Sequence, residues 1–226
     1  MPTQELLDQV RELKNIGRTP KEIARALKMS PSAVAPLIRL VAAAEGQTRE
    51  DALIGCWINP GWSSSVQGPE RPDWPGSRPS ERTGHSGLVT VLVARDRGGS
   101  RAGVCFYLID TWCLGVKNAA GPQSMDRRRL SGFIQQIFSA WDEPAVQVPL
   151  ELGRQIVHGA IGYAREQGFE PHADFERAAA YLGAWDGRCE LTFGMDGKPM
   201  YISGPYDDGL SIIRHLQAHQ AAAAVS

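Results

Sequence analysis

The sequence predicts an α+β protein with an N-terminal helical module, a Pro/Gly-rich linker and a C-terminal domain of antiparallel hairpins packed with helices. Apolar residues recur every three to four positions in residues 1–58, the helical period, and alternate every second position from residue 88 onward, the strand period. Proline and glycine dominate the stretch between these parts. We therefore expect a helical module at 1–58, a linker at 59–87 and an α+β domain at 88–226.

The helices of the first region are predicted from their caps and from one apolar face. Thr19 and Glu22 stand three residues apart, as in a capping box that begins a helix. Ser30 followed by Pro31 begins another helix in the same way. The apolar stretch 52–57 fits either a further helix or the start of a strand. An earlier helix is indicated by the apolar residues Leu6, Leu7, Val10, Leu13 and Ile16.

The predicted linker contains two tryptophans, Trp62 and Trp74, among its prolines and glycines. Proline removes backbone donors and glycine costs backbone entropy, so neither regular helix nor strand is expected there. We interpret 59–87 as a flexible linker. The alternative is an ordered arm whose tryptophans dock on a neighbouring surface.

The second region combines predicted hairpins with helices. A Gly-Gly turn at 95–100 joins the first two strands, and residues 111–116 either extend the second strand or follow a bend. The segment 118–124 is expected to be a loop. Strands are predicted over 88–94, 102–110, 190–193 and 200–203. Helices are predicted over 127–141, 150–167, 173–182 and 210–219.

Residues 19–40 resemble the helix-turn-helix regions of bacterial transcription regulators. A helix of about eight residues, a short turn and a second capped helix give the spacing of that motif. The resemblance implies that the second helix lies at the edge of a DNA groove while basic residues contact phosphates. The nucleic-acid-binding residues it indicates are Lys21, Arg25, Lys28 and Arg39 at phosphates, with Ser30 and Ser32 at the groove edge.

The charge distribution favours a nucleic-acid contact in this module alone. The chain has 24 basic and 25 acidic residues, a net charge of -1, which excludes a uniformly basic nucleic-acid coat. Between Arg11 and Arg39, however, seven basic residues face only two acidic ones. The second helix has few hydrogen-bonding side chains, and Pro36 lies within it, so we expect poor base readout. The target is predicted to be DNA, with RNA, the ribosome or a protein partner as alternatives.

Three polar, turn-rich segments of the second region carry a wider resemblance. They are residues 110–117, 168–175 and 193–208. Together they resemble a family of uncharacterised bacterial proteins, common in actinobacteria, that place a helix-turn-helix before such an α+β domain. The likeness covers roughly residues 88–215 and implies no activity.

A divalent-metal site is the sharpest enzymatic hypothesis that the second region allows. Hard cations favour clustered carboxylates, and zinc favours histidine and cysteine. The metal candidates are His172, Asp174, Asp207 and Asp208, and Asp110 is a further carboxylate that could join them. We interpret the acidic candidates first as stabilisers of helix N-termini. No catalytic residue, metal or cofactor is therefore predicted, and a non-enzymatic role is favoured.

Other reactive residue types are interpreted structurally. Cys105 and Cys113 lie in or beside apolar strands, which predicts inert thiols, and His158 is expected in the core. Arginine at a helix start opposes the helix dipole, so an anion, RNA or an acidic partner could favour it there. That possible anion or RNA contact consists of Arg127, Arg128 and Arg129.

The length of the apolar runs and the number of cysteines predict the cellular compartment. The longest apolar run is shorter than the ~18 residues of a membrane span, and four scattered cysteines do not form a disulfide scaffold. We expect a cytoplasmic protein that does not contact membranes. The favoured function is a DNA-binding, regulator-like protein whose second domain senses a ligand or mediates assembly, including homodimer formation. An RNA- or ribosome-associated protein comes second, and a divalent-metal hydrolase or nuclease third.

Overall fold

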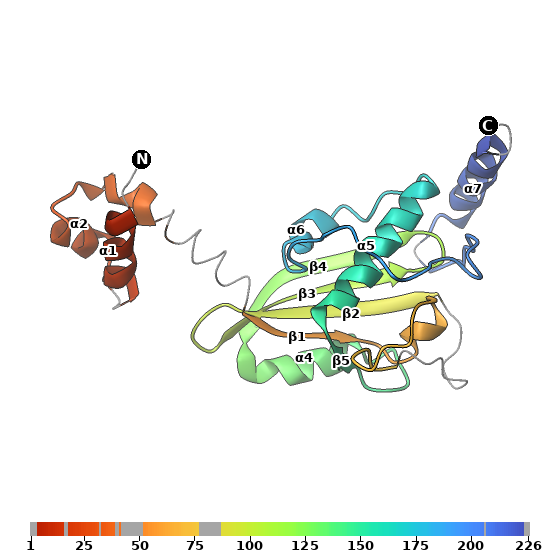
Figure 1. Ribbon diagram of the computed structural model, residues 1–226, viewed down its shortest axis with the longest axis horizontal. Helices are drawn as coiled ribbons and strands as arrows, with labels where there is room; N and C mark the ends of the chain where they lie inside the picture. The colour runs from red at the N-terminus through yellow and green to blue at the C-terminus, as the bar shows by residue number, and fades with distance from the viewer. Residues whose placement is uncertain are drawn as a thin grey trace. The chain divides into compact units, whose positions relative to one another are not determined.

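The chain divides into two compact units, Met1–Ala52 and Leu53–Ser226. The computed structural model describes residues 4–15, 18–31, 33–38, 41, 52–76, 87–205 and 207–223, drawn as coloured ribbon in Figure 1. The first unit is helical, and the second contains a sheet with helices on its faces. The predicted α+β class is therefore confirmed.

The first unit has a helical core built from local signals. Its elements are α1 (Gln4–Asn15), α2 (Pro20–Ala26) and further helical residues at 31, 33–38 and 41. The Thr19 hydroxyl accepts the N–H of Glu22, and the Glu22 carboxylate accepts the N–H of Thr19 at 2.8 Å, so the predicted capping box is confirmed. The side chains buried between these helices are Val10, Ile23, Ala24, Val34, Leu37 and Val41.

The second unit contains one five-stranded sheet in the order β4-β3-β2-β1-β5, with every neighbouring pair antiparallel. Figure 1 shows its long central strands. Gly98 and Gly99 adopt left-handed conformations in the turn from β2 to β3, which confirms the predicted hairpin. The strands are β1 (Leu53–Ile58), β2 (Leu88–Asp96), β3 (Arg101–Asp110), β4 (Gly115–Asp126) and β5 (Val146–Val148).

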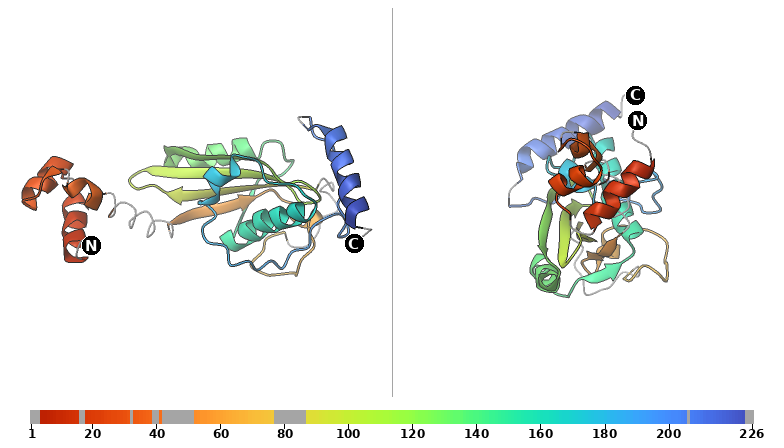
Figure 2. Two further views of the ribbon diagram at one scale, coloured as in Figure 1. Left: turned by 90° about the horizontal axis from the view of Figure 1, so that it is seen from above. Right: turned by 90° about the vertical axis from the view of Figure 1, so that its left-hand side faces the viewer.

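Helices cover both faces of this sheet. The left view of Figure 2 shows α4 on one side of the strands and α5 on the other. Side chains alternate along each strand, so Val91 and Val93 pack in the cluster beneath α5, whereas Leu92 and Ala94 pack in the cluster beneath α4. The helical elements are η1 (Trp62–Ser64), η2 (Arg127–Arg129), α4 (Leu130–Ile137), α5 (Leu150–Glu166), α6 (Phe175–Ala179) and α7 (Gly209–Ala223).

The predicted loop at 118–124 is wrong, because β4 continues through it to Asp126. This segment contains Gly121 and Pro122, which normally interrupt strands. β4 lies at the edge of the sheet, where a residue without an N–H need not break the ladder on both sides. The register against β3 shifts beside these residues, between Val104 and Phe106.

The predicted module boundary and linker also differ from the structure. Residues 53–58 form β1 inside the sheet, so the division between units lies before them. Trp62 and Trp74 are buried in the core of the second unit with their rings edge to face at 6.2 Å, and the Trp62 indole N–H donates to the Pro75 carbonyl at 2.8 Å. Proline and glycine exclude regular elements here but do not prevent packing. The remainder of the predicted linker, 77–86, lies outside the described residues.

The segment after α6 contains less regular structure than predicted. The expected strand at 190–193 is reduced to an isolated bridge between Thr192 and Gln67, and residues 200–203 form no strand. A second isolated bridge, between Met195 and Lys198, closes the turn between these two segments. The helix expected over 127–141 ends at Ile137.

Among the described residues, no helix has both the length and the apolar character needed to cross a membrane.

Candidate nucleic-acid interface

Three basic side chains form an exposed stripe on the first unit, here called the α2 stripe: Lys21, Arg25 and Lys28. Lys21 and Arg25, four residues apart, lie on one side of α2, away from the buried Ile23 and Ala24, and Lys28 follows in the turn that ends the helix. All three residues are exposed. The stripe therefore presents three positive charges to solvent.

None of the charges of the α2 stripe has an ion-pair partner within the part of the chain that the structure describes. Other basic residues of this unit do have one: Arg11 pairs with Asp8, and Arg18 approaches Glu22 at 3.4 Å. None of the three stripe residues forms an ion pair with a described residue. Their charges are therefore available to an external anion.

Lys28 is held in position by the turn that ends α2. Its φ is 52°, in the left-handed region that glycine usually occupies after a helix. The Lys28 N–H donates to the Arg25 carbonyl at 3.2 Å, and the Met29 N–H donates to the Ala24 carbonyl at 2.9 Å. These two bonds form a Schellman motif with lysine at the glycine position. A cation at this place also interacts favourably with the C-terminal end of the helix dipole.

Of the two predicted groove-edge residues, Ser30 already uses its hydroxyl within the first unit. The Ser30 hydroxyl accepts the N–H of Ala33 at 3.2 Å, so it caps the following helix. The other exposed described positions of that helix are Pro31, Ala33 and Pro36, which have no side-chain donors or acceptors. Ser32 and Arg39 lie outside the described residues. The described part of this helix therefore offers little hydrogen bonding to base edges.

The arginine run at η2 has partners within the second unit. Asp126 caps η2 by accepting the Arg128 N–H at 2.9 Å, and it also binds the Arg128 guanidinium at 3.0 Å. The hydrogen bond from that guanidinium lowers the pKa of the Asp126 carboxyl. Arg127 lies 3.7 Å from Asp96, and Arg129 forms no ion pair with a described residue. Asp126, directly before the run in the sequence, is the signal that indicates this local pairing.

The metal candidates do not gather into one site. The described residues contain no group of three His, Cys, Asp or Glu side chains able to hold a metal ion. His172 and Asp174 are exposed and face each other at 3.7 Å. Asp208 instead accepts the N–H of Ser211 at 3.2 Å, at the start of α7. These residues therefore act locally, in turns and at a helix start.

Asp207 and Asp110 each have a structural role. Asp207 lies 2.6 Å from the Lys117 ammonium, and both side chains are largely buried. Partial burial opposes its ionisation, but the hydrogen bond from Lys117 holds the pKa of Asp207 below its ordinary value. Asp110 accepts the N–H groups of Trp112 at 2.9 Å and Cys113 at 3.0 Å in the β3–β4 turn. Burial raises the pKa of Asp110, although these bonds oppose the shift.

The buried thiols and His158 are not poised for catalysis. Burial raises the pKa of Cys105 and of Cys113 to about 12, so both are protonated thiols near neutral pH. His158 stacks on Trp185 with 5.1 Å between ring centroids. Burial, and then the charge of Arg154, lower the pKa of His158, which favours the neutral ring.

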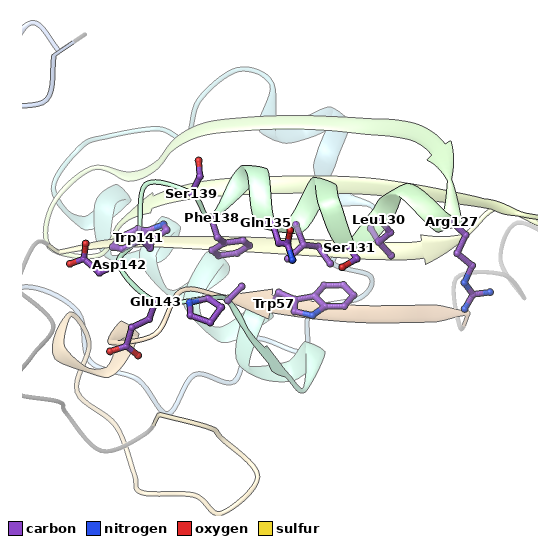
Figure 3. Close-up of a pocket in the computed structure, with 13 residues that line it drawn as sticks. Trp57, Arg127, Leu130, Ser131, Gln135, Phe138, Ser139, Trp141, Asp142 and Glu143 are labelled. Atoms are coloured by element: carbon purple, nitrogen blue, oxygen red, sulfur yellow. The ribbon is translucent and has the colours of Figure 1, made fainter.

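A groove lies on the α4 side of the sheet and was not anticipated from the sequence. It separates α4 from β1, has a volume of about 770 Å³ and is here called the α4 groove (Figure 3). Arg127 stands at one end, while Asp142 and Glu143 stand at the other (Figure 3). Its walls are largely aromatic and aliphatic, from Trp57, Leu130, Ile134, Phe138, Trp141 and Ala145.

Comparison of the chain with protein-family models, with curated proteins and with solved structures finds no match.

Proposed function

We propose that the first unit binds duplex DNA, chiefly through the phosphate backbone, and that the second unit senses a ligand or mediates assembly. The observation that carries the proposal is the α2 stripe, whose three exposed charges have no partner among the described residues. The protein would then be a regulator-like protein that discriminates only weakly between DNA sequences. This proposal keeps the function favoured by the sequence and specifies which charges perform it.

The place of the stripe supports DNA as the target. In helix-turn-helix docking, the first helix crosses the phosphate backbone while the second enters the major groove. The stripe lies along α2, the helix that would cross the backbone, and Lys28 extends it to the turn before the next helix. Lysine at the left-handed position of that turn costs about 1 kcal/mol relative to glycine. In return it adds a positive charge beside the proposed phosphates.

Weak base reading follows from the next helix. Ser30 uses its hydroxyl as a cap, and Ala33 and Pro36 cannot donate or accept hydrogen bonds through their side chains. Base discrimination needs side chains that reach donors and acceptors in the groove. We therefore expect nearly equal affinity for duplexes of different sequence.

The test compares charge removal inside and outside the stripe in the full chain. Lys21→Ala with Arg25→Ala removes two unpaired charges, and the control Arg11→Ala removes a charge already paired with Asp8. Counterion release contributes about eightfold in affinity per neutralised phosphate at about 0.1 M salt. Fluorescence anisotropy with a labelled duplex should show a loss of roughly sixtyfold for the double variant and a much smaller loss for the control.

Equal effects of the two substitutions would contradict the proposal, as would absence of duplex binding at low salt. Tighter binding to single-stranded RNA than to duplex DNA would favour the RNA-associated alternative instead. Circular dichroism of each variant would establish that the helices remain folded.

A further inference from the structure

We propose that the α4 groove binds a flat aromatic cation. This inference specifies the ligand class of the second unit and rests on the ligand-sensing part of the proposed function. It uses none of the residues of the α2 stripe.

The dimensions and walls of the groove suit a small organic molecule. Its volume of about 770 Å³ lies within the range of ligand pockets, about 300–1,000 Å³. Phe138 points from α4 toward β1, and the Trp57 indole lies along the opposite wall (Figure 3). Trp57 and Trp141 are only partly buried, so both keep aromatic surface that a flat ligand could cover.

The shape of the Trp57 wall depends on a glycine in the same strand. A Cβ placed on Gly55 would lie 2.5 Å from the Trp57 ring and 3.0 Å from the Gln147 amide nitrogen. Gly55 thus leaves room for the indole to lie along β1, beside the edge strand β5. Any side chain at residue 55 would displace that ring.

The charge at one end of the groove selects a cation. The connection from α4 to β5 carries Trp141, Asp142 and Glu143 in succession, and all three line this end of the groove (Figure 3). Both carboxylates are exposed, and neither forms an ion pair with a described residue. Cations bind favourably over aromatic faces and near carboxylates. Arg127, at the far end, lies 3.7 Å from the Asp96 carboxylate, which partly neutralises its charge and weakens its attraction for an anionic ligand.

A pair of xanthene dyes of similar ring size tests the inference in the full-length chain without DNA. Rhodamine 6G is the cationic probe and fluorescein the anionic one. Dye anisotropy should show saturable binding of rhodamine 6G at micromolar concentration and no binding of fluorescein in the same range. Asp142→Asn with Glu143→Gln should weaken rhodamine binding about tenfold, because two attractive charges near the surface are lost.

Two further variants separate the groove from general charge effects. Asp174→Asn with Glu176→Gln makes the same charge change at exposed positions outside the groove lining, and should leave binding unchanged. Gly55→Ala should weaken binding by displacing the Trp57 ring. Equal binding of both dyes, equal losses in the two carboxylate variants, or no rhodamine binding would overturn the inference. Each of these results leaves the duplex-binding test unaffected, so the two proposals fail separately.

Discussion

Replacing Trp62 by alanine tests whether the segment after β1 belongs to the core of the second unit. The Trp62 side chain is 2 % exposed and packs edge to face with Trp74. Burying about 200 Å² at ~25 cal/mol per Å² corresponds to about 5 kcal/mol, in line with measured Trp→Ala losses of about 3–5 kcal/mol. The substitution also leaves the Pro75 carbonyl without its indole donor. We therefore expect the free energy of unfolding to fall by about 4–5 kcal/mol.

Urea unfolding of the full chain, followed by tryptophan fluorescence, measures this change. All six tryptophans lie after residue 52, so the signal reports only the second unit. With a denaturant slope of about 2 kcal/mol/M, the midpoint should move down by about 2 M. Leu210→Ala, at a side chain 70 % exposed, is the control and should cost less than about 0.5 kcal/mol. A loss below about 1 kcal/mol for Trp62→Ala would refute the placement of this segment in the core.

Three other predictions concern backbone conformation and ionisation. Lys28→Gly should stabilise the first unit by about 1 kcal/mol in thermal unfolding followed by circular dichroism, and should weaken duplex binding; a loss of stability would contradict the left-handed turn. Asp110→Asn keeps an oxygen acceptor for the N–H groups of Trp112 and Cys113. Because folding raises the pKa of Asp110, its ionisation destabilises the folded chain at any pH above the ordinary pKa of aspartate, so this variant should be neutral or stabilising near pH 7. Asp110→Ala should instead lose about 2–4 kcal/mol in urea unfolding, and equal losses for the two variants would argue against a buried charge. The pKa of His158 is lowered in the folded chain, so the unfolded chain gains the proton first and stability should decline as pH falls below about 6.5; His158→Gln should reduce that decline, and an unchanged pH profile would contradict it.

Local signals allowed much of the fold to be predicted from the sequence. The capping box at Thr19 and the glycine turn after β2 are each set by residues a few positions apart, and both are present. The course of β4 was not predicted, because Gly121 and Pro122 are tolerated only through its edge position in the sheet. Trp62 and Trp74 are buried in one cluster with residues of α5 and β1. α5 is distant in sequence, and the residues of β1 were predicted to belong to the N-terminal helical module. Proline content alone could not reveal this packing.

The candidate sites also divide into one that a short stretch of sequence indicates and others that depend on contacts between distant residues. The α2 stripe was predictable because its charges lie within eight residues of the sequence, on α2 and on the turn that ends it. The pairing of Lys117 with Asp207 joins residues 90 positions apart, so the acidic pair at 207–208 was open to a metal interpretation from sequence. The α4 groove combines β1, α4 and the connection to β5, and no local pattern indicates a cavity between them.

The salt dependence of duplex binding measures how many charges of the α2 stripe contact phosphates. Three phosphate contacts predict that the logarithm of the binding constant falls with the logarithm of salt concentration with a slope of about −2.7. Lys21→Ala with Arg25→Ala should reduce the slope to about −0.9, because one stripe charge remains. A slope near zero for the natural chain, or the same slope in the double variant, would contradict the assignment of DNA binding to the α2 stripe.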